Sequence, residues 1–346
     1  MVSTTHSDIL IIGAGPAACS ASIICAQNKL NVTLIDVEKQ PTLRPGESLH
    51  PGIISLLEKL GIRDQFLSAG FLKYKGNWIK WNNEHCKFES FGEDSFGKWL
   101  GFQASRPLFD KLLLQHCKNL GINIIQSCKA IEPIVKNDRI TGLVTSTKSI
   151  KSSFLIDATG GSHWLARRNN MTIKKYSPNL IAYYGYVKRK FMNIDKFPMI
   201  KADQMGWIWI ARIKSYIYQW VRLFFHNEYT KNKITTMIPQ EFSGCTPIVS
   251  RGSDVSWRIV SKPAGKGYFI VGDAVFVLDP LSSHGIIKAI MSGIMTGYLI
   301  SKIKDNSIDE EKAFSYYTNW IFDWFNNDIK TLRDLYLKHP YPPNWI

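Results

Sequence analysis

One short segment near the N-terminus constrains the fold more than any other part of this 346-residue chain. Residues 8–12 form an apolar run typical of a β-strand, and they lead directly into Gly13-Ala14-Gly15-Pro16-Ala17-Ala18. Residues 17–28 have helical composition, and residues 31–36 read as a second strand. This order of strand, glycine turn, helix and strand predicts a βαβ unit that binds a dinucleotide.

Each residue type in the turn has a physical task. Gly13 allows the tight turn, and Gly15 lets the backbone approach a pyrophosphate. Ala18 lets the helix pack closely on the strand, and the helix N-terminus presents free N–H groups to the phosphates. Asp36 ends the second strand, where a carboxylate can accept hydrogen bonds from a ribose. A glycine turn with an incidental acid is the alternative, and the coincidence of all four features argues against it.

The rest of the chain predicts an α/β fold with a second, mainly antiparallel region. Helices are expected over residues 53–60, 107–119, 284–302 and 309–337. Strands are expected over 153–157 and 267–271, in a meander at 122–147, and in the aromatic-rich stretches 71–104 and 170–260. The sequence shows no internal repeat and no low-complexity linker, so we expect both regions to share one body.

Amino-acid composition favours some classes of function and argues against others. The chain has 43 Lys and Arg against 28 Asp and Glu, which favours an anionic cofactor, an acidic partner, nucleic acid or a membrane surface. The cations are scattered through an Asn-, Lys- and Ile-rich chain, which argues against nucleic acid. No run reaches the ~18 apolar residues that would span a bilayer. Six cysteines without a CxxC pair argue against a metal site and a disulfide framework, and they predict a cytoplasmic protein.

Two later segments carry a resemblance to a known superfamily. Asp157-Ala158-Thr159-Gly160 closes a strand in the middle of the chain, and Gly272-Asp273 closes another. Together with the glycine turn, this order resembles the FAD-dependent aromatic hydroxylases and flavin-dependent halogenases over nearly the whole chain. The resemblance implies a Rossmann-type FAD-binding domain of the glutathione reductase class, interleaved with a mainly antiparallel β substrate domain. It assigns residues 1–70, 100–170 and 255–305 to the FAD domain, 71–99 and 171–254 to the substrate domain, and 306–346 to a C-terminal helical segment.

The resemblance also implies which residues hold FAD. The Asp273 carboxylate would hydrogen-bond the ribityl chain, and the following helix would point its N-terminus at the flavin pyrimidine ring. Residues 44–51 and 279–285 resemble the two loops that lie on either side of the isoalloxazine ring. The expected cofactor residues are Gly13, Gly15, Ala18, Asp36, Arg44, Glu47, Ser48, Arg106, Gly160, Gly272, Asp273, Pro280 and Gly285. Because there is no second GxGxxG motif, NAD(P)H docking transiently or a separate flavin reductase would reduce the flavin.

A further set of residues provides candidates for the reaction itself. His50 and His284 lie in the two flavin-side loops, where an imidazole can move protons or only satisfy the loop. Trp207 and Trp209 lie on one face of a strand and resemble the Trp-x-Trp-x-Ile-Pro motif of the halogenases, with Ala and Arg in place of Ile-Pro. They would line a substrate pocket together with Ser283. Lys73 and Lys75 are candidates for the lysine that the halogenases use, or belong to a solvated strand face.

The closest resemblance is to halogenase-like flavoproteins that modify tryptophan during the maturation of cysteine tryptophylquinone oxidases. It rests on the segments Arg-Pro-Gly-Glu-Ser-Leu-His-Pro and Leu-Asp-Pro-Leu-Ser-Ser-x-Gly. The first expectation is therefore a monooxygenase that transfers oxygen from O₂ to an indole or phenol ring, free or within a peptide or protein. The alternatives are a flavin-dependent halogenase of an aromatic substrate, an FAD-dependent reductase of an apolar substrate, and a non-catalytic flavin-binding partner.

Overall fold

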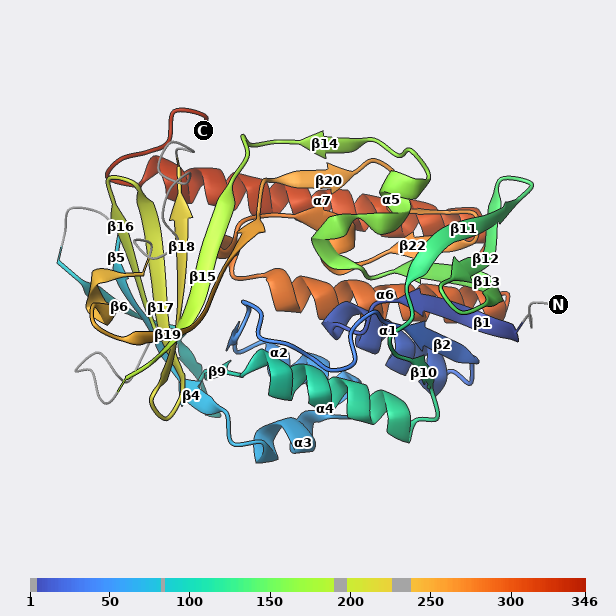
Figure 1. The fold of residues 1–346 in the computed structure, drawn as a ribbon, viewed down its shortest axis with the longest axis horizontal. Helices are drawn as coiled ribbons and strands as arrows, with labels where there is room; N and C mark the ends of the chain where they lie inside the picture. The colour runs from blue at the N-terminus through green and yellow to red at the C-terminus, as the bar shows by residue number, and fades with distance from the viewer. Residues whose placement is uncertain (1–4, 82–84, 190–197, 226–237) are drawn as a thin grey trace.

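Two β-sheets of different character form the framework of the protein, and a long C-terminal helix runs past both (Figure 1). The computed structural model describes residues 5–81, 85–189, 198–225 and 238–346.

The first sheet is built around the strand that precedes the glycine turn. Its parallel part contains, in spatial order, β10 (Asn123–Ile125), β2 (Val32–Ile35), β1 (Thr5–Ile12), β13 (Ser149–Asp157) and β22 (Tyr268–Ile270). An antiparallel extension is formed by β12 (Arg139–Thr145), β11 (Ala130–Lys136) and β21 (Ala264–Gly265). Because the carboxyl ends of parallel strands meet at one edge, the glycine turn, the Ala-Thr-Gly segment and the Gly-Asp segment are brought together there.

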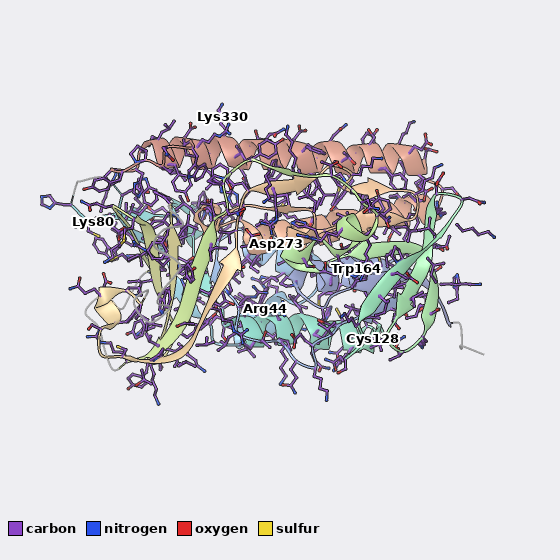
Figure 2. The ribbon with its side chains drawn as sticks, turned by 45° about the horizontal axis from the view of Figure 1, so that its top comes forward. Arg44, Lys80, Cys128, Trp164, Asp273 and Lys330 are labelled. Atoms are coloured by element: carbon purple, nitrogen blue, oxygen red, sulfur yellow. The ribbon has the colours of Figure 1, made fainter. Side chains whose placement is uncertain are left out.

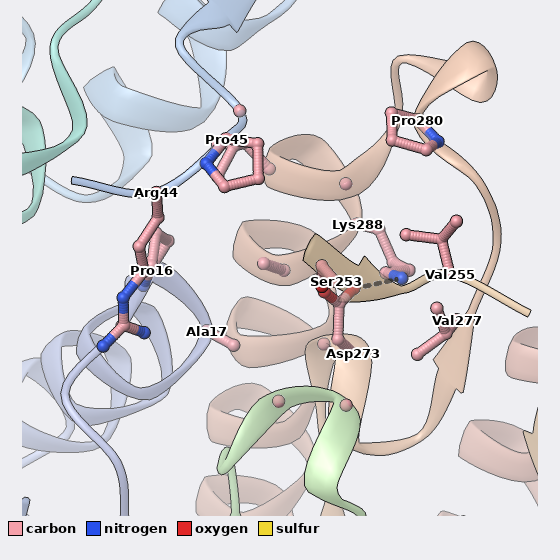
Figure 3. Close-up of a pocket in the computed structure, with 18 of the residues that line it drawn as sticks. Pro16, Ala17, Arg44, Pro45, Ser253, Val255, Asp273, Val277, Pro280 and Lys288 are labelled. Carbon is pink, nitrogen blue, oxygen red and sulfur yellow. Dashed lines mark ion pairs between the residues drawn. The ribbon is translucent and has the colours of Figure 1, made fainter. Parts of the chain in front are cut away.

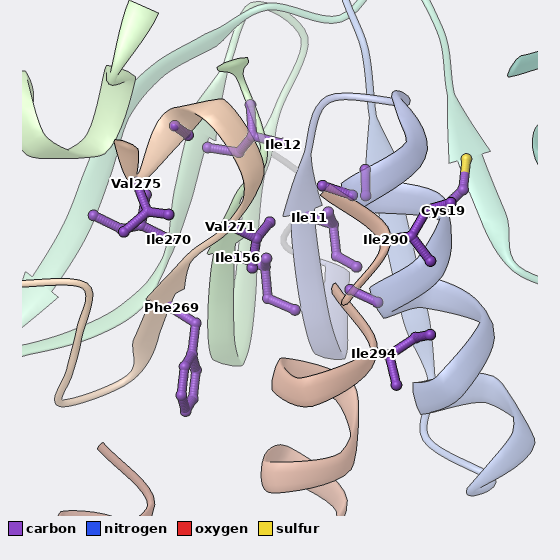
Figure 4. Close-up of a cluster of buried hydrophobic side chains, with 14 of the residues drawn as sticks. Ile11, Ile12, Cys19, Ile156, Phe269, Ile270, Val271, Val275, Ile290 and Ile294 are labelled. Carbon is purple, nitrogen blue, oxygen red and sulfur yellow. The ribbon is translucent and has the colours of Figure 1, made fainter. Parts of the chain in front are cut away.

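The core lies between this sheet and two helices, α1 (Pro16–Gln27) and α6 (Gly285–Lys304). Figure 4 shows Ile11 and Ile156, from the neighbouring strands β1 and β13, on the side of Ile290 and Ile294 of α6. By length and composition α6 could cross a membrane, but half of its apolar window is buried against the rest of the protein. The other helices of the first region are α2 (Ile53–Lys59), α3 (Arg63–Ser68), α4 (Arg106–Asn119) and α5 (Trp164–Arg168).

The second sheet is almost entirely antiparallel. Its seven strands are, in spatial order, β19 (Thr246–Asp254), β15 (Ile181–Lys188), β18 (Ile217–Phe224), β17 (Gly206–Lys214), β16 (Met199–Asp203), β5 (Gly76–Lys80) and β6 (Lys87–Ser90). Among the described strands of this sheet, only β16 and β5 pair in parallel. Three smaller sheets contain β3 (Ser48–Leu49), β9 (Gly101–Gln103) and β4 (Leu72–Tyr74); β14 (Ile173–Lys175), β20 (Arg258–Val260) and β23 (Phe276–Val277); and β7 (Glu93–Asp94) with β8 (Gly97–Lys98).

Helix α7 (Glu310–Leu337) runs along the top of the molecule, from the first sheet to the second (Figure 1). Asp309 caps it by accepting hydrogen bonds from the first free N–H groups of the helix. At the first sheet the Tyr317 hydroxyl donates to the Ile270 carbonyl oxygen (2.7 Å). At the second sheet Trp81 donates its indole N–H to the Leu335 carbonyl oxygen (2.9 Å). The helix therefore connects the two regions.

The α/β fold class expected from the sequence is confirmed, including a parallel nucleotide-binding sheet and a mainly antiparallel second sheet. The main expected helices are present with bounds that differ by one to two residues. Helix α3 was not predicted, because its six residues are too short to show a helical period. The division of the chain into domains stays a prediction.

Close packing of α6 on α1 depends on Gly293. A Cβ at Gly293 would lie 2.4 Å from the Ala17 carbonyl oxygen, so the helices would have to separate. We expect Gly293→Ala to lower the free energy of unfolding by ~1–3 kcal/mol, measured by urea denaturation. Tyr298→Ala, on an exposed part of the same helix, should change it by roughly 0.5 kcal/mol or less. Equal effects of the two substitutions would contradict this packing.

Candidate active site

A large cavity runs from the glycine turn to the second sheet, with a volume of about 780 Å³. This volume lies within the range of small-molecule and cofactor sites. Figure 2 labels Arg44, Cys128, Trp164 and Asp273, which come from four separate segments and all line the cavity. Of the expected cofactor residues, only Ala18 does not line it. Ala18 is fully buried within α1, as its expected packing role requires.

One end of the cavity is suited to an anionic group. Helix α1 begins there with Gly15 at its N-cap, no side chain caps it, and its first turn has no acidic residue. Its first N–H groups are therefore open to a ligand. A Cβ at Gly15 would meet nothing within 4 Å, whereas a Cβ at Gly13 would lie 2.6 Å from the Ala158 carbonyl oxygen. Gly13 thus shapes the turn, and Gly15 leaves space in front of it.

The loop after β13 forms the next part of the wall and is held by buried polar groups. The Asp157 carboxylate accepts a hydrogen bond from the backbone N–H of Thr159 (2.9 Å). Arg258 donates to Nε2 of His163 (2.7 Å) and to the Gly161 carbonyl oxygen (3.1 Å). Burial lowers the pKa of His163 to about 4, so this imidazole is neutral and supports the loop without adding charge.

Asp273 follows in the middle of the cavity and has a buried cationic partner (Figure 3). Its carboxylate lies 2.6 Å from the ammonium of Lys288, whose side chain is only 5% exposed. The same ammonium donates to the Phe276 carbonyl oxygen (2.8 Å) and lies 4.3 Å from the centre of the Phe276 ring. Lys288 therefore fixes the Asp273 side chain, which remains about half exposed. No local sequence motif marks Lys288.

The loop at residues 44–48 forms the opposite wall and contains a buried carboxyl group. Glu47 is 1% exposed, and burial raises its pKa to about 7. The Tyr186 hydroxyl from β15 hydrogen-bonds one Glu47 oxygen and lies 2.8 Å from the Arg44 carbonyl oxygen. The other Glu47 oxygen is buried and has no hydrogen-bond partner among the described residues. A buried acceptor on the cavity wall indicates that a polar ligand group belongs beside it.

Arg106 supports this loop, and Ser48 fixes its end. Arg106 is buried, pairs with Asp110 (2.9 Å) and donates to the Pro45 carbonyl oxygen (2.8 Å). The Ser48 hydroxyl donates to the side-chain oxygen of Gln103 (2.8 Å). Both residues line the cavity, as the sequence analysis expects of cofactor-binding residues.

The far end of the cavity lies between the loop at 279–285 and the second sheet. Pro280, Ser283, Gly285, Trp207 and Trp209 all line it. A Cβ at Gly285 would meet nothing within 4 Å. Helix α6 begins here without a side-chain cap and without an acidic residue in its first turn. The N-termini of α1 and α6 therefore face the same cavity.

A buried hydrogen-bond network fixes Trp207. Its indole N–H donates to the Tyr336 hydroxyl of α7 (2.9 Å), which in turn donates to the Asp279 carboxylate (2.9 Å). Trp257 donates its indole N–H to the same carboxylate oxygen (2.7 Å). Burial raises the pKa of Asp279 to about 6. The position of Trp207 in the aromatic wall therefore depends on the C-terminal helix.

The three expected catalytic residues lie in different environments. His284 lines the cavity and contacts Asp328 of α7. His50 does not line it; its ring packs 5.6 Å from that of Phe91, and burial and the nearby His284 lower its pKa. Lys73 is exposed on β4 and does not line the cavity.

Among the described residues, no three His, Cys, Asp or Glu side chains gather as metal ligands, and the six cysteines are free.

The sequence and the fold are similar to those of known halogenases. Residues 8–101 and 99–336 match the family model described as tryptophan halogenase. Tryptophan 2-halogenase of Chondromyces crocatus is 25% identical over 348 residues, which cover 90% of this chain and 64% of the relative, so the chain spans less than two thirds of that enzyme. A Pseudoalteromonas luteoviolacea brominase of pyrrole-2-carbonyl groups on a peptidyl-carrier protein is 25% identical, over 90% of this chain and 81% of the relative.

Solved structures share the fold. The myxobacterial chondrochloren halogenase superposes with a TM-score of 0.88 at 20% identity, covering 97% of this chain and 83% of that one. The flavin-dependent brominase Bmp2 gives a TM-score of 0.80 at 22% identity, covering 93% and 84%.

The space in front of Gly15 allows a clean test of the nucleotide site. Because a Cβ there meets no protein atom, Gly15→Val should fold normally but fill the space that the pyrophosphate needs. We expect loss of the yellow chromophore from the purified variant, with an unchanged circular dichroism spectrum. A folded Gly15→Val protein that retains stoichiometric flavin would contradict the assignment.

The raised pKa of Glu47 predicts a pH dependence of stability. The folded protein binds the Glu47 proton more tightly than the unfolded chain, so this contribution to stability is full below pH 4.5 and is lost as the pH rises through 7. Between about pH 5 and about pH 8, wild type should therefore lose roughly 3 kcal/mol more than Glu47→Gln in urea unfolding. Glu58→Gln, at an exposed site, should follow wild type. Parallel curves for wild type and Glu47→Gln would show that Glu47 is already ionised at the lower pH.

Proposed function

The chain belongs to the tryptophan halogenase family, and on this premise we propose that it is an FAD-dependent enzyme that halogenates an electron-rich aromatic ring. The observation that carries the proposal is the continuity of the cavity. One end has the features of a dinucleotide site, and the other has an aromatic wall. The comparisons favour halogenation, the alternative of the sequence analysis, over the oxygen transfer that the sequence analysis placed first.

The residues present fit FAD. The N-terminus of α1 and Gly15 would hold the pyrophosphate, and Asp36 would hold a ribose. Asp273, fixed by Lys288, would accept hydrogen bonds from the ribityl hydroxyls. Reduced FAD supplies the reaction with oxygen from which an oxidised halogen species is made. Since the chain has no second dinucleotide motif, a separate flavin reductase is the expected source of reduced flavin.

The aromatic end of the cavity suits a flat substrate. Trp207 and Trp209 line it from the second sheet, together with Tyr184. Offset and edge-to-face ring contacts add roughly 0.5–1.5 kcal/mol to the burial of an aromatic ligand. The substrate class that this wall supports is an indole, phenol or pyrrole, either free or carried by a peptide or protein. Rigid packing of Trp207 on Tyr336 would keep water away from the reacting ring.

Oxygen transfer to the same ring is the second candidate, and the placement of the lysines favours it. Lys73 and Lys75, which the resemblance to halogenases singles out, do not line the cavity. Among the described residues, the lysines that line the cavity are Lys129 and Lys288. The Lys288 ammonium is paired with Asp273.

The mass of the product separates the two candidates. With FAD, NADH, a flavin reductase, sodium bromide and indole, we expect a product in which bromine replaces hydrogen. Oxygen transfer would instead add one oxygen atom in both the presence and the absence of bromide. Because Lys73 lies outside the cavity, Lys73→Ala should retain product formation within about twofold. Loss of the brominated product in Lys73→Ala, with flavin reoxidation intact, would show that Lys73 acts in halogenation after all.

A further inference from the structure

Helix α7 brings one carboxylate into the cavity. Asp328 lines the far end of the cavity, although it comes from the C-terminal helix. Its side chain is 9% exposed, and one oxygen lies 2.9 Å from Nδ1 of His284. The His284 side chain is 43% exposed. A carboxylate and an imidazole therefore meet at the wall of the substrate end.

Asp328 lies on an otherwise apolar face of α7, so its hydrogen bond with His284 accounts for a carboxylate at this position. The buried face of α7 consists otherwise of Ala313, Tyr317, Ile321, Phe325, Ile329, Leu332 and Tyr336. A buried carboxylate among such residues is unfavourable unless it is hydrogen-bonded. The hydrogen-bond partner of Asp328 among the described residues is His284. Packing alone would favour an apolar residue at this place.

The contact determines the tautomer of His284. An ionised carboxylate only accepts hydrogen bonds, so Nδ1 of His284 carries the hydrogen and donates it. In the neutral ring the lone pair is then on Nε2. No described residue hydrogen-bonds Nε2. His50, from the other flavin-side loop, is the nearby second imidazole, and burial holds its pKa below its usual value. Nε2 of His284 is therefore a proton acceptor that a ligand in the cavity can reach.

We propose that His284 is the base that removes the ring proton during aromatic substitution, and that Asp328 is its positioning residue. The inference rests on the proposed function. An oxidised halogen species of the hypohalous acid class forms the carbon–halogen bond as its halogen–oxygen bond breaks, and the oxygen leaves as hydroxide. The C–H bond at the same carbon then breaks, its electron pair returns to the ring, and Nε2 takes the proton. Transfer of this proton to hydroxide gives water and restores His284.

Kinetics on ring-deuterated indole test the role of the pair. We expect Asp328→Asn to lower product formation about 10²-fold with KM changed less than threefold, because a general base contributes on this scale. We also expect a C–H isotope effect absent from wild type to appear in Asp328→Asn and His284→Gln, since proton removal becomes slow. FAD binding should be unchanged. Asp323→Asn removes the same charge from an exposed site of α7 and should behave as wild type. Full activity of Asp328→Asn would overturn the proposal.

A spectroscopic measurement keeps this test separate from the proposed function. In the pH range in which the ring is neutral, the protein labelled with ¹⁵N-histidine should show a ring protonated at Nδ1, assigned to His284 by its loss in His284→Gln. In Asp328→Asn the tautomer should change or become mixed. If wild type modifies no indole but shows this tautomer and its dependence on Asp328, the proposed function fails and the pairing stands. An Nε2-protonated ring in wild type, or an unchanged ring in Asp328→Asn, would overturn the inference.

Discussion

The site depends on the parallel pairing of β1 with its neighbours in the first sheet. Pairing with β2 and β13, and of β13 with β22, brings the ends of four strands to one edge. The glycine turn, the loop at 158–161 and the Gly272-Asp273 segment follow these ends and line one cavity. Two helix N-termini without acidic residues face the same cavity. An anionic cofactor therefore matches the electrostatics that this sheet topology creates.

The C-terminal helix completes the other end of the cavity. Tyr336 connects Trp207 of the second sheet to Asp279 of the flavin-side loop, and Asp328 contacts His284. From the sequence, this segment was expected only as a helix over residues 309–337. The structure shows it packed along both sheets, with Asp328 lining the cavity and Tyr336 hydrogen-bonded to Trp207. Its role is thus positional as well as structural.

Of the residues that the sequence singled out, those of the glycine turn and the second strand line the cavity, whereas His50 and Lys73 do not. Gly13, Gly15 and Asp36 are recognised from local patterns, because strand, turn and helix follow one another directly in the chain. Lys288, Arg258 and Asp328 were missed, because each acts on a group supplied by another element and no local pattern marks such a contact. His50 and Lys73 were expected at the reaction site from short motifs alone. Such motifs do not specify which way a side chain points, and neither residue lines the cavity.

A crystal structure of the FAD complex tests the central claim that one cavity holds the cofactor and the aromatic substrate. The account predicts the adenosine end of FAD beside Gly15 and Asp36. It predicts the isoalloxazine ring between the loop at 44–48 and the loop at 280–285, with Trp207 and His284 within about two side-chain lengths of the ring. A flavin ring bound away from both loops, with Trp207 and His284 out of reach, would contradict it.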